Sequence, residues 1–186
     1  ERPEMKHTII LLLLLALPAH GDDAARERAE AMVRDAFASA TPEEWETRIR
    51  QDQAQALCSQ YRNQPPPEVA QRLLQAQQRT LRYPQDGKLM GDWQRGEKLA
   101  SIGTGGHIGQ IQPDRPGTPK GGNCYACHTL ATKEIAAGNL GPSLTGFGKL
   151  RGHGPEVIQY TYEKIYNAQA FFPCSMMPRF GHNAWL

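Results

Sequence analysis

The hydrophobic pattern of the chain begins with one unbroken apolar run, residues 9–17, close to its start. Lys6 precedes the run, and Ala19-His20-Gly21 follows it. Nine residues span about 13 Å as a helix, against roughly 30 Å for a bilayer core. A basic start, a short apolar stretch and a small-x-small end are typical of a secretory signal peptide. We expect residues 1–21 to be a leader and signal peptide, Met5 to be the natural start and the mature chain to lie in an oxidising compartment; an uncleaved anchor is the alternative.

Residues 22–88 carry apolar positions at helical spacing on a polar background rich in Ala, Glu, Arg and Gln. Thr41-Pro42-Glu43-Glu44 is a capping-box pattern with Pro at the first helical position. Three consecutive prolines, residues 65–67, end one helix and begin another. The apolar stripe of these helices is narrow. We therefore expect a helical N-terminal extension that packs on another part of the protein.

Gly and Pro become frequent after this extension. Residues 91–99 and 156–167 have the pattern of short helices, and long Gly-rich loops separate them. No stretch alternates between apolar and polar residues as a strand would. The predicted fold class is all-α, with a helical extension at 22–88 and a second domain at 89–186.

Composition narrows the classes of function. The 186 residues include 21 Lys+Arg and 19 Asp+Glu, a formal charge of +2 that is too small to indicate nucleic acid binding. The hydrophobic fraction is 39%, and part of it lies in the N-terminal run, so the apolar core of the mature chain is modest. Four cysteines are too few for a disulfide scaffold, so each needs its own explanation.

Cys124-Tyr125-Ala126-Cys127-His128 is a C-x-x-C-H motif, the attachment signature of c-type haem. Two thiols on one helical turn reach the two vinyl groups of one porphyrin, and the next residue points at the iron. A structural zinc site would need a second ligand pair, and a redox C-x-x-C would need a βαβ context and no His. We therefore predict one covalently attached haem c, bound through Cys124 and Cys127, with His128 as an axial ligand.

A second axial ligand is expected downstream of this motif, from Met176, Met177, His153 or His182. Met177 is preferred because Pro178 stiffens the chain just after it. Thioether ligation also raises the reduction potential relative to a second imidazole. Met176 and the two histidines stay as alternatives.

Cys58 and Cys174 remain as an even pair in an oxidising compartment. A disulfide between them would close a long loop and stabilise the fold by about 4–5 kcal/mol on the chain-entropy model. Two free thiols, or a bond to a partner protein, are the alternatives.

Segments of the chain resemble known families. Residues 139–144, Asn-Leu-Gly-Pro-Ser-Leu, resemble a segment of class I cytochromes c, in which the proline carbonyl accepts a hydrogen bond from the axial histidine. More specific segments resemble the SoxX family, the monohaem subunits of the SoxAX complexes of bacterial sulfur oxidation. These segments are residues 58–63, 83–93, 122–128, 162–168 and 174–183.

The resemblance implies a class I cytochrome c fold over 89–186, with Pro142 beside His128. It implies a periplasmic heterodimer with SoxA that couples thiosulfate oxidatively to a cysteine of the carrier protein SoxYZ. In that family the sulfur chemistry is assigned to SoxA, and the SoxX subunit passes electrons to a downstream cytochrome. We thus expect an electron-transfer subunit of an L-cysteine S-thiosulfotransferase, with no catalytic residue of its own and no nucleic acid or membrane partner.

Class I cytochromes c normally close with a C-terminal helix, whereas only nine residues follow Met177. That helix is therefore expected to be missing. The alternative function is a free-standing periplasmic electron carrier, which would not need the extension at 22–88. A haem-based sensing module would need an open ligand position on the iron, whereas Met177 is expected to occupy that position.

Overall fold

A computed structural model describes residues 21–38, 40–104, 117–134 and 136–186. Throughout these ranges the chain forms helices and turns and no strand, so the all-α prediction is confirmed for them. None of the described helices is long and apolar enough to cross a membrane. Residues 1–20 of the predicted leader lie outside the described residues.

The chain divides into two compact units, residues 1–39 and residues 40–186. The first unit contains α1 (Gly21–Ala36), a helix of good helix-forming residues whose described side chains are exposed. The division lies well before residue 88, where the sequence placed a domain boundary. The helix that precedes residue 88 and the helix that follows it both belong to the second unit.

The second unit begins with α2 (Pro42–Glu44), which runs into a wider turn, η1 (Trp45–Ile49). The capping box predicted for Thr41 is present, because its hydroxyl accepts from the Glu44 N–H at 3.2 Å and the Glu44 carboxylate accepts from the Thr41 N–H at 3.0 Å. The helical segment ends at Ile49, and a new helix, α3 (Gln53–Gln60), begins after it. Asp52 caps α3 in a second capping box with Gln55, at 2.8 and 2.9 Å.

The core of this unit joins the extension to the C-terminal part of the chain. After α3 comes α4 (Pro67–Gln78), and α4 packs against η3 (Ala168–Ala170). The buried apolar cluster has members from α3, from α4 and from the loop that follows η3. They are Ala54, Cys58, Val69, Leu73 and Cys174, with Leu57 and Tyr61 packed against them.

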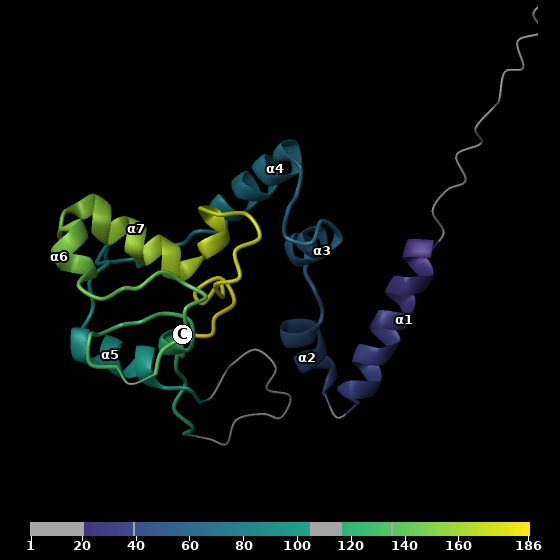
Figure 1. Cartoon of the computed structure of the whole chain (residues 1–186), viewed down its shortest axis with the longest axis horizontal. Coiled ribbons are helices and arrows are strands. Elements are labelled where there is room, and N and C mark those ends of the chain that lie inside the picture. Colours follow the sequence, from purple (N-terminus) through teal and green to yellow (C-terminus); the bar gives the residue numbers. More distant parts are fainter. Residues whose placement is uncertain (1–20, 39, 105–116, 135) are drawn as a thin grey trace, which may run out of the picture. The chain divides into compact units, whose positions relative to one another are not determined.

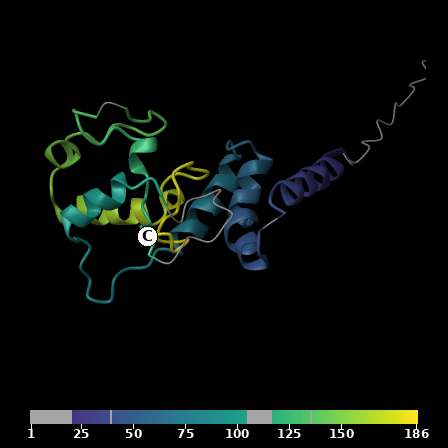
Figure 2. The same ribbon diagram turned by 90° about the horizontal axis from the view of Figure 1, so that it is seen from below.

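The remaining elements lie between α4 and η3 along the chain, and one of them, η2, is part of the C-x-x-C-H motif. They are α5 (Trp93–Ser101), η2 (Cys124–Ala126), α6 (Phe147–Arg151) and α7 (Pro155–Tyr166). Asp92 caps α5 by accepting from the Arg95 N–H at 2.7 Å, and Pro155 begins α7. Figure 1 shows α5 and α7 separated by loop segments, and Figure 2 shows the same elements turned by 90°. α5 contributes no buried residue although it is amphipathic.

Candidate functional site: the Cys124–His128 turn

The predicted site residues Cys124, Cys127 and His128 lie on one tight turn that follows the loop after α5. Asn123 enters the turn in the left-handed region, at φ 47°, and η2 covers the next three residues. The His128 N–H donates to the Cys124 carbonyl at 2.9 Å, which closes the turn. The two thiols and the imidazole therefore leave the backbone within one short segment.

The imidazole of His128 is oriented by the loop that follows it. Its Nδ1 lies 2.7 Å from the carbonyl oxygen of Pro142. Because a carbonyl oxygen only accepts, Nδ1 carries the proton in this contact, and Nε2 is left with a lone pair when the ring is neutral. This is the Pro142 contact that the class I cytochrome c resemblance implied.

Two glycines let the loop at residues 138–144 lie directly on the turn. Gly138 donates to the Tyr125 carbonyl and Gly141 donates to the Cys127 carbonyl, both at 2.8 Å. A Cβ on Gly138 would lie 1.8 Å from the carbonyl oxygen of Ala126, and one on Gly141 would lie 2.2 Å from Cε1 of His128. These approaches need residues without a side chain.

The thiols of Cys124 and Cys127 are unpaired with each other and partly buried. Burial raises the pKa of the Cys124 thiol, because it disfavours the charged thiolate, and the neighbouring Cys127 adds to this effect. Cys124 is therefore held as a neutral thiol at physiological pH. Low-pKa activation of the kind found in redox-reactive cysteines is not what this environment provides.

Met177 lies in a different loop from the turn. Its backbone N–H donates to the hydroxyl of Ser175 at 3.3 Å, and its side chain is partly buried, whereas the neighbouring Met176 is 78% exposed. No described contact joins Met177 to His128. The structure thus distinguishes the two methionines by their burial.

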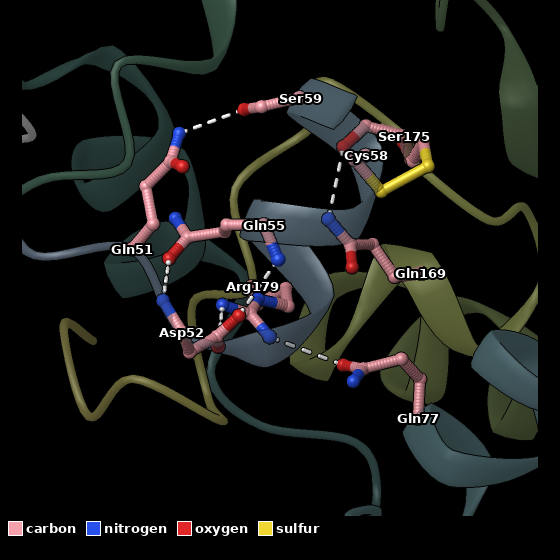
Figure 3. Close-up of a disulfide and its surroundings, with 10 residues drawn as sticks. Gln51, Asp52, Gln55, Cys58, Ser59, Gln77, Gln169, Ser175 and Arg179 are labelled. Atoms are coloured by element: carbon pink, nitrogen blue, oxygen red, sulfur yellow. Dashed lines mark hydrogen bonds and ion pairs between the residues drawn. A yellow bond between two sulfur atoms is a disulfide. The ribbon is translucent and has the colours of Figure 1, made fainter. Parts of the chain in front are cut away.

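The loop that carries Met177 is anchored to α3. Cys58 and Cys174 form a disulfide, with Sγ–Sγ 2.05 Å and Cα–Cα 5.4 Å (Figure 3). Arg179, 4% exposed, is ion-paired with Asp52 and donates to the side-chain oxygen of Gln77 at 3.2 Å. Met177 therefore sits between two anchors that are three and two residues away along the chain.

A buried polar network extends these anchors to α4. The fully buried Asn167 donates to the side-chain oxygen of Gln77 at 2.9 Å and to the hydroxyl of Thr80 at 2.8 Å. The side chain of Asn167 also accepts from the Gln169 N–H at 3.0 Å, which caps η3. Sequence reasoning missed this network, because Asn167, Gln77 and Arg179 are ordinary polar residues and their separation along the chain carries no local signal.

A hollow of about 560 Å³ lies beside α6 and α7 and is mostly apolar. Its lining includes Leu89, Phe147, Ile158, Tyr162 and Leu186. Of the predicted ligands and their alternatives, only His153 is part of this lining. The hollow nonetheless adjoins the turn, because a Cβ on Gly122 would lie 3.3 Å from Leu186 and 3.1 Å from the sulfur of Cys124.

The predicted haem c is not supported by the donor atoms of the structure, and this prediction is corrected. The described residues contain no group of three or more His, Cys, Asp or Glu side chains that could hold a metal ion. Spacing along the sequence placed Cys124, Cys127 and His128 on one turn, and the structure places them there too, but they do not form such a group. Haem c is therefore withdrawn as the cofactor of this turn.

The comparisons with known proteins give a limited result. No family model matches the chain. Over 107 residues the chain is 44% identical to an uncharacterized lipoprotein of Aquifex aeolicus (strain VF5). The match covers 58% of this chain and 48% of that protein, so the chain matches about half of the length of this relative. This relative is named only as a lipoprotein, and its name gives no activity.

Proposed function

We propose that the chain is an exported electron-transfer subunit of a SoxAX-type complex, in which SoxA carries the sulfur chemistry and thiosulfate is coupled to a cysteine of SoxYZ. The proposal concerns the partner and the reaction that the subunit serves. It assigns no catalytic residue to this chain.

The observation that carries the proposal is that the segments resembling SoxX contact one another. Residues 58–63 and 174–183 are joined by the Cys58–Cys174 disulfide. Residues 83–93 meet residues 162–168 where Tyr83 donates to Glu163. Segments that are scattered along the sequence thus make up connected parts of one unit, as they would if they had been retained for one fold.

Two further observations favour export. Stable disulfides are formed in oxidising compartments and are rare in the cytosol, and Cys58–Cys174 is buried within the core cluster. The Aquifex relative is named as a lipoprotein, a class of protein that is exported. We propose a periplasmic location on these grounds, together with the signal-peptide pattern of residues 1–21.

The finer fold assignment belongs with this proposal. We infer that residues 89–186 follow the chain order of class I cytochromes c, with α5 first, then the turn, the Gly-Pro loop and α7. The 2.7 Å contact between His128 and Pro142 supports this order, because the family resemblance implied that contact from the sequence alone. This inference concerns only the order in which these elements follow one another along the chain.

Co-expression with SoxA tests the partner directly. The chain with its own leader is produced in a bacterial periplasm together with tagged SoxA, and the complex is isolated by affinity and size-exclusion chromatography. We expect a one-to-one heterodimer that survives both steps. Recovery of the chain as a monomer, with SoxA folded and alone, would overturn the proposed partner and favour a free-standing electron carrier.

A further inference from the structure

Three tyrosine rings lie in a row beside the hollow. The centroids of Tyr83 and Tyr162 are 5.9 Å apart, with their planes at 22°, and those of Tyr162 and Tyr166 are 6.0 Å apart, at 30°. Tyr162 and Tyr166 are one helical turn apart on α7, which places their rings on the same face. Tyr83 comes from the segment between α4 and α5 and completes the row.

The row extends from the hollow to the surface of the unit. Tyr162 and Tyr166 line the hollow, whereas Tyr83 is 49% exposed. Tyr166 is packed closely at its inner end, since a Cβ on Gly181 would lie 2.2 Å from the Tyr166 ring. Ring spacings of about 4.5–7 Å are those of aromatic pairs in direct contact, so each ring of the row packs on the next.

Only one described phenol of the row is paired with a base. The hydroxyl of Tyr83 donates to a carboxylate oxygen of Glu163, and the side-chain amide of Gln159 donates to the same oxygen at 2.7 Å, which orients the carboxylate. The hydroxyl of Tyr162 instead donates to the backbone carbonyl of Arg82 at 2.9 Å. A carboxylate accepts a proton readily, whereas a backbone carbonyl does not.

This difference decides where an oxidised tyrosine would be stabilised. A phenol that loses one electron becomes strongly acidic, and its radical persists when the proton leaves to a base already in hydrogen-bond contact. Tyr83 has that base, whereas the acceptor for Tyr162 is a carbonyl oxygen. The hydrogen bond to Glu163 also raises the pKa of Tyr83, so the phenol carries its proton until it is oxidised.

We propose that Tyr83, Tyr162 and Tyr166 form a one-electron relay, with Tyr83 as the redox-active end and Glu163 as its proton acceptor. The external reactant is a one-electron oxidant strong enough to oxidise a phenol, the class to which photogenerated ruthenium(III) complexes belong. One electron passes from the row to the oxidant, and the Tyr83 proton moves to Glu163. The products are a neutral tyrosyl radical at Tyr83, a neutral Glu163 carboxyl group and the oxidant reduced by one electron.

The relay goes beyond the proposed electron-transfer function and stands without SoxA. Flash photolysis of tris(bipyridine)ruthenium(II) with persulfate, mixed with the full chain, generates the oxidant in the sample. Freeze-quenched electron paramagnetic resonance then measures the yield of tyrosyl radical. We expect a tyrosyl signal in the unmodified protein, and a several-fold lower yield in Tyr83→Phe.

Two more variants separate the relay from a general loss of surface phenols. Glu163→Gln keeps the shape of the acceptor but removes its basicity, so the radical should form several-fold more slowly. Tyr160→Phe removes another exposed phenol of α7, whose ring packs edge-on against Phe171 at 5.0 Å, and should leave the yield unchanged.

Circular dichroism confirms that each variant is folded before the radical is measured. No tyrosyl signal in the unmodified protein would overturn the relay. So would an unchanged yield in Tyr83→Phe, an unchanged rate in Glu163→Gln, or an equal loss in Tyr160→Phe.

Discussion

The imidazole of His128 donates through Nδ1 to the carbonyl oxygen of Pro142, at 2.7 Å, and this contact fixes the direction in which the ring faces. The contact predicts that neutral His128 is the Nδ1–H tautomer, with the lone pair on Nε2. Nitrogen-15 NMR of the protein labelled at histidine checks this by the separate shifts of the two ring nitrogens. A neutral His128 with its proton on Nε2 would contradict the assigned hydrogen bond.

The glycine beside this ring provides a structural test of the turn. A Cβ in Gly141→Ala would lie 2.2 Å from Cε1 of His128, so the ring or the loop must move. We expect a loss of about 1–3 kcal/mol in the free energy of unfolding, as for other overpacked sites. Denaturant titration measures the loss, and the NMR shifts of His128 should change with it.

Gly96→Ala is the matched control for this substitution. Gly96 lies inside α5 with nothing within 4 Å of its Cβ position. Alanine favours the helix there by roughly 0.5–1 kcal/mol, so the control should be neutral or more stable. Equal effects of the two substitutions would show that Gly141 does not support the ring.

The disulfide is expected to contribute strongly to stability, because it closes a long loop. Replacing both Cys58 and Cys174 by Ser removes a cross-link that spans 116 residues of sequence. On the chain-entropy model this lowers the free energy of unfolding by about 4–5 kcal/mol, an upper value. Urea titration of the variant and of the unmodified protein, each with and without reductant, measures the difference. Reductant should destabilise only the unmodified protein; no response there would contradict the cross-link.

The ion pair of Asp52 with Arg179 predicts a defined dependence on pH. Burial alone would raise the pKa of Asp52, but the hydrogen bond from the Gln55 N–H and the guanidinium of Arg179 outweigh it, and the pKa lies below its usual value. A carboxyl whose pKa is lowered on folding stabilises the fold above its unfolded-state pKa of about 3.9. That contribution is lost as the pH falls through the folded-state value.

Asp52→Asn tests this contribution. We expect a loss of about 2–4 kcal/mol at pH 7, below the value for a fully buried pair because 43% of the Asp52 side chain is exposed. The difference from the unmodified protein should be constant between about pH 5 and 7 and should shrink below about pH 4. Asp86→Asn breaks an exposed pair with Lys88 and should cost less than about 1 kcal/mol. If the loss of stability caused by Asp52→Asn grew on acidification, the prediction would be contradicted.

The thiol environment gives a kinetic prediction. Because burial raises the pKa of Cys124, its thiolate fraction near pH 7 is small. In protein produced without residues 1–21 in the cytosol, alkylation of Cys124 by iodoacetamide should be slower at pH 7 than that of a free cysteine peptide. The rate should still be rising above pH 9. Mass spectrometry of timed samples measures it, and a rate at pH 7 equal to that of the peptide would show an exposed, unshifted thiol.

The sequence allowed the local elements and the Cys58–Cys174 disulfide to be predicted, and the structure shows why the other long-range contacts were not. Thr41, Asp92 and Pro155 mark helix starts through contacts within a few residues, so their roles are readable from the sequence alone. The end of the helical segment at Ile49, just before Asp52, was not predicted, because apolar residues continue at helical spacing past this point. Arg179 and Gln77 are 102 residues apart, and nothing near either one indicates the other.

The candidate site was predictable in part for the same reason. The motif residues Cys124, Cys127 and His128 lie so close together along the chain that the sequence alone places them on one turn. The contact of His128 with Pro142 followed from a family resemblance, not from spacing. The motif also predicted a haem, which the donor groups of the described residues do not support.

Electron release driven by thiosulfate is the most direct test of the proposed role. The periplasmically produced complex of this chain with SoxA is mixed with SoxYZ, thiosulfate and ferricyanide as electron acceptor, and SoxYZ is examined by mass spectrometry. We predict ferricyanide reduction that requires thiosulfate, SoxYZ and both subunits, together with a thiosulfonate adduct on the SoxYZ cysteine. An equal rate and an equal yield of adduct with SoxA alone would contradict the proposed role of this chain.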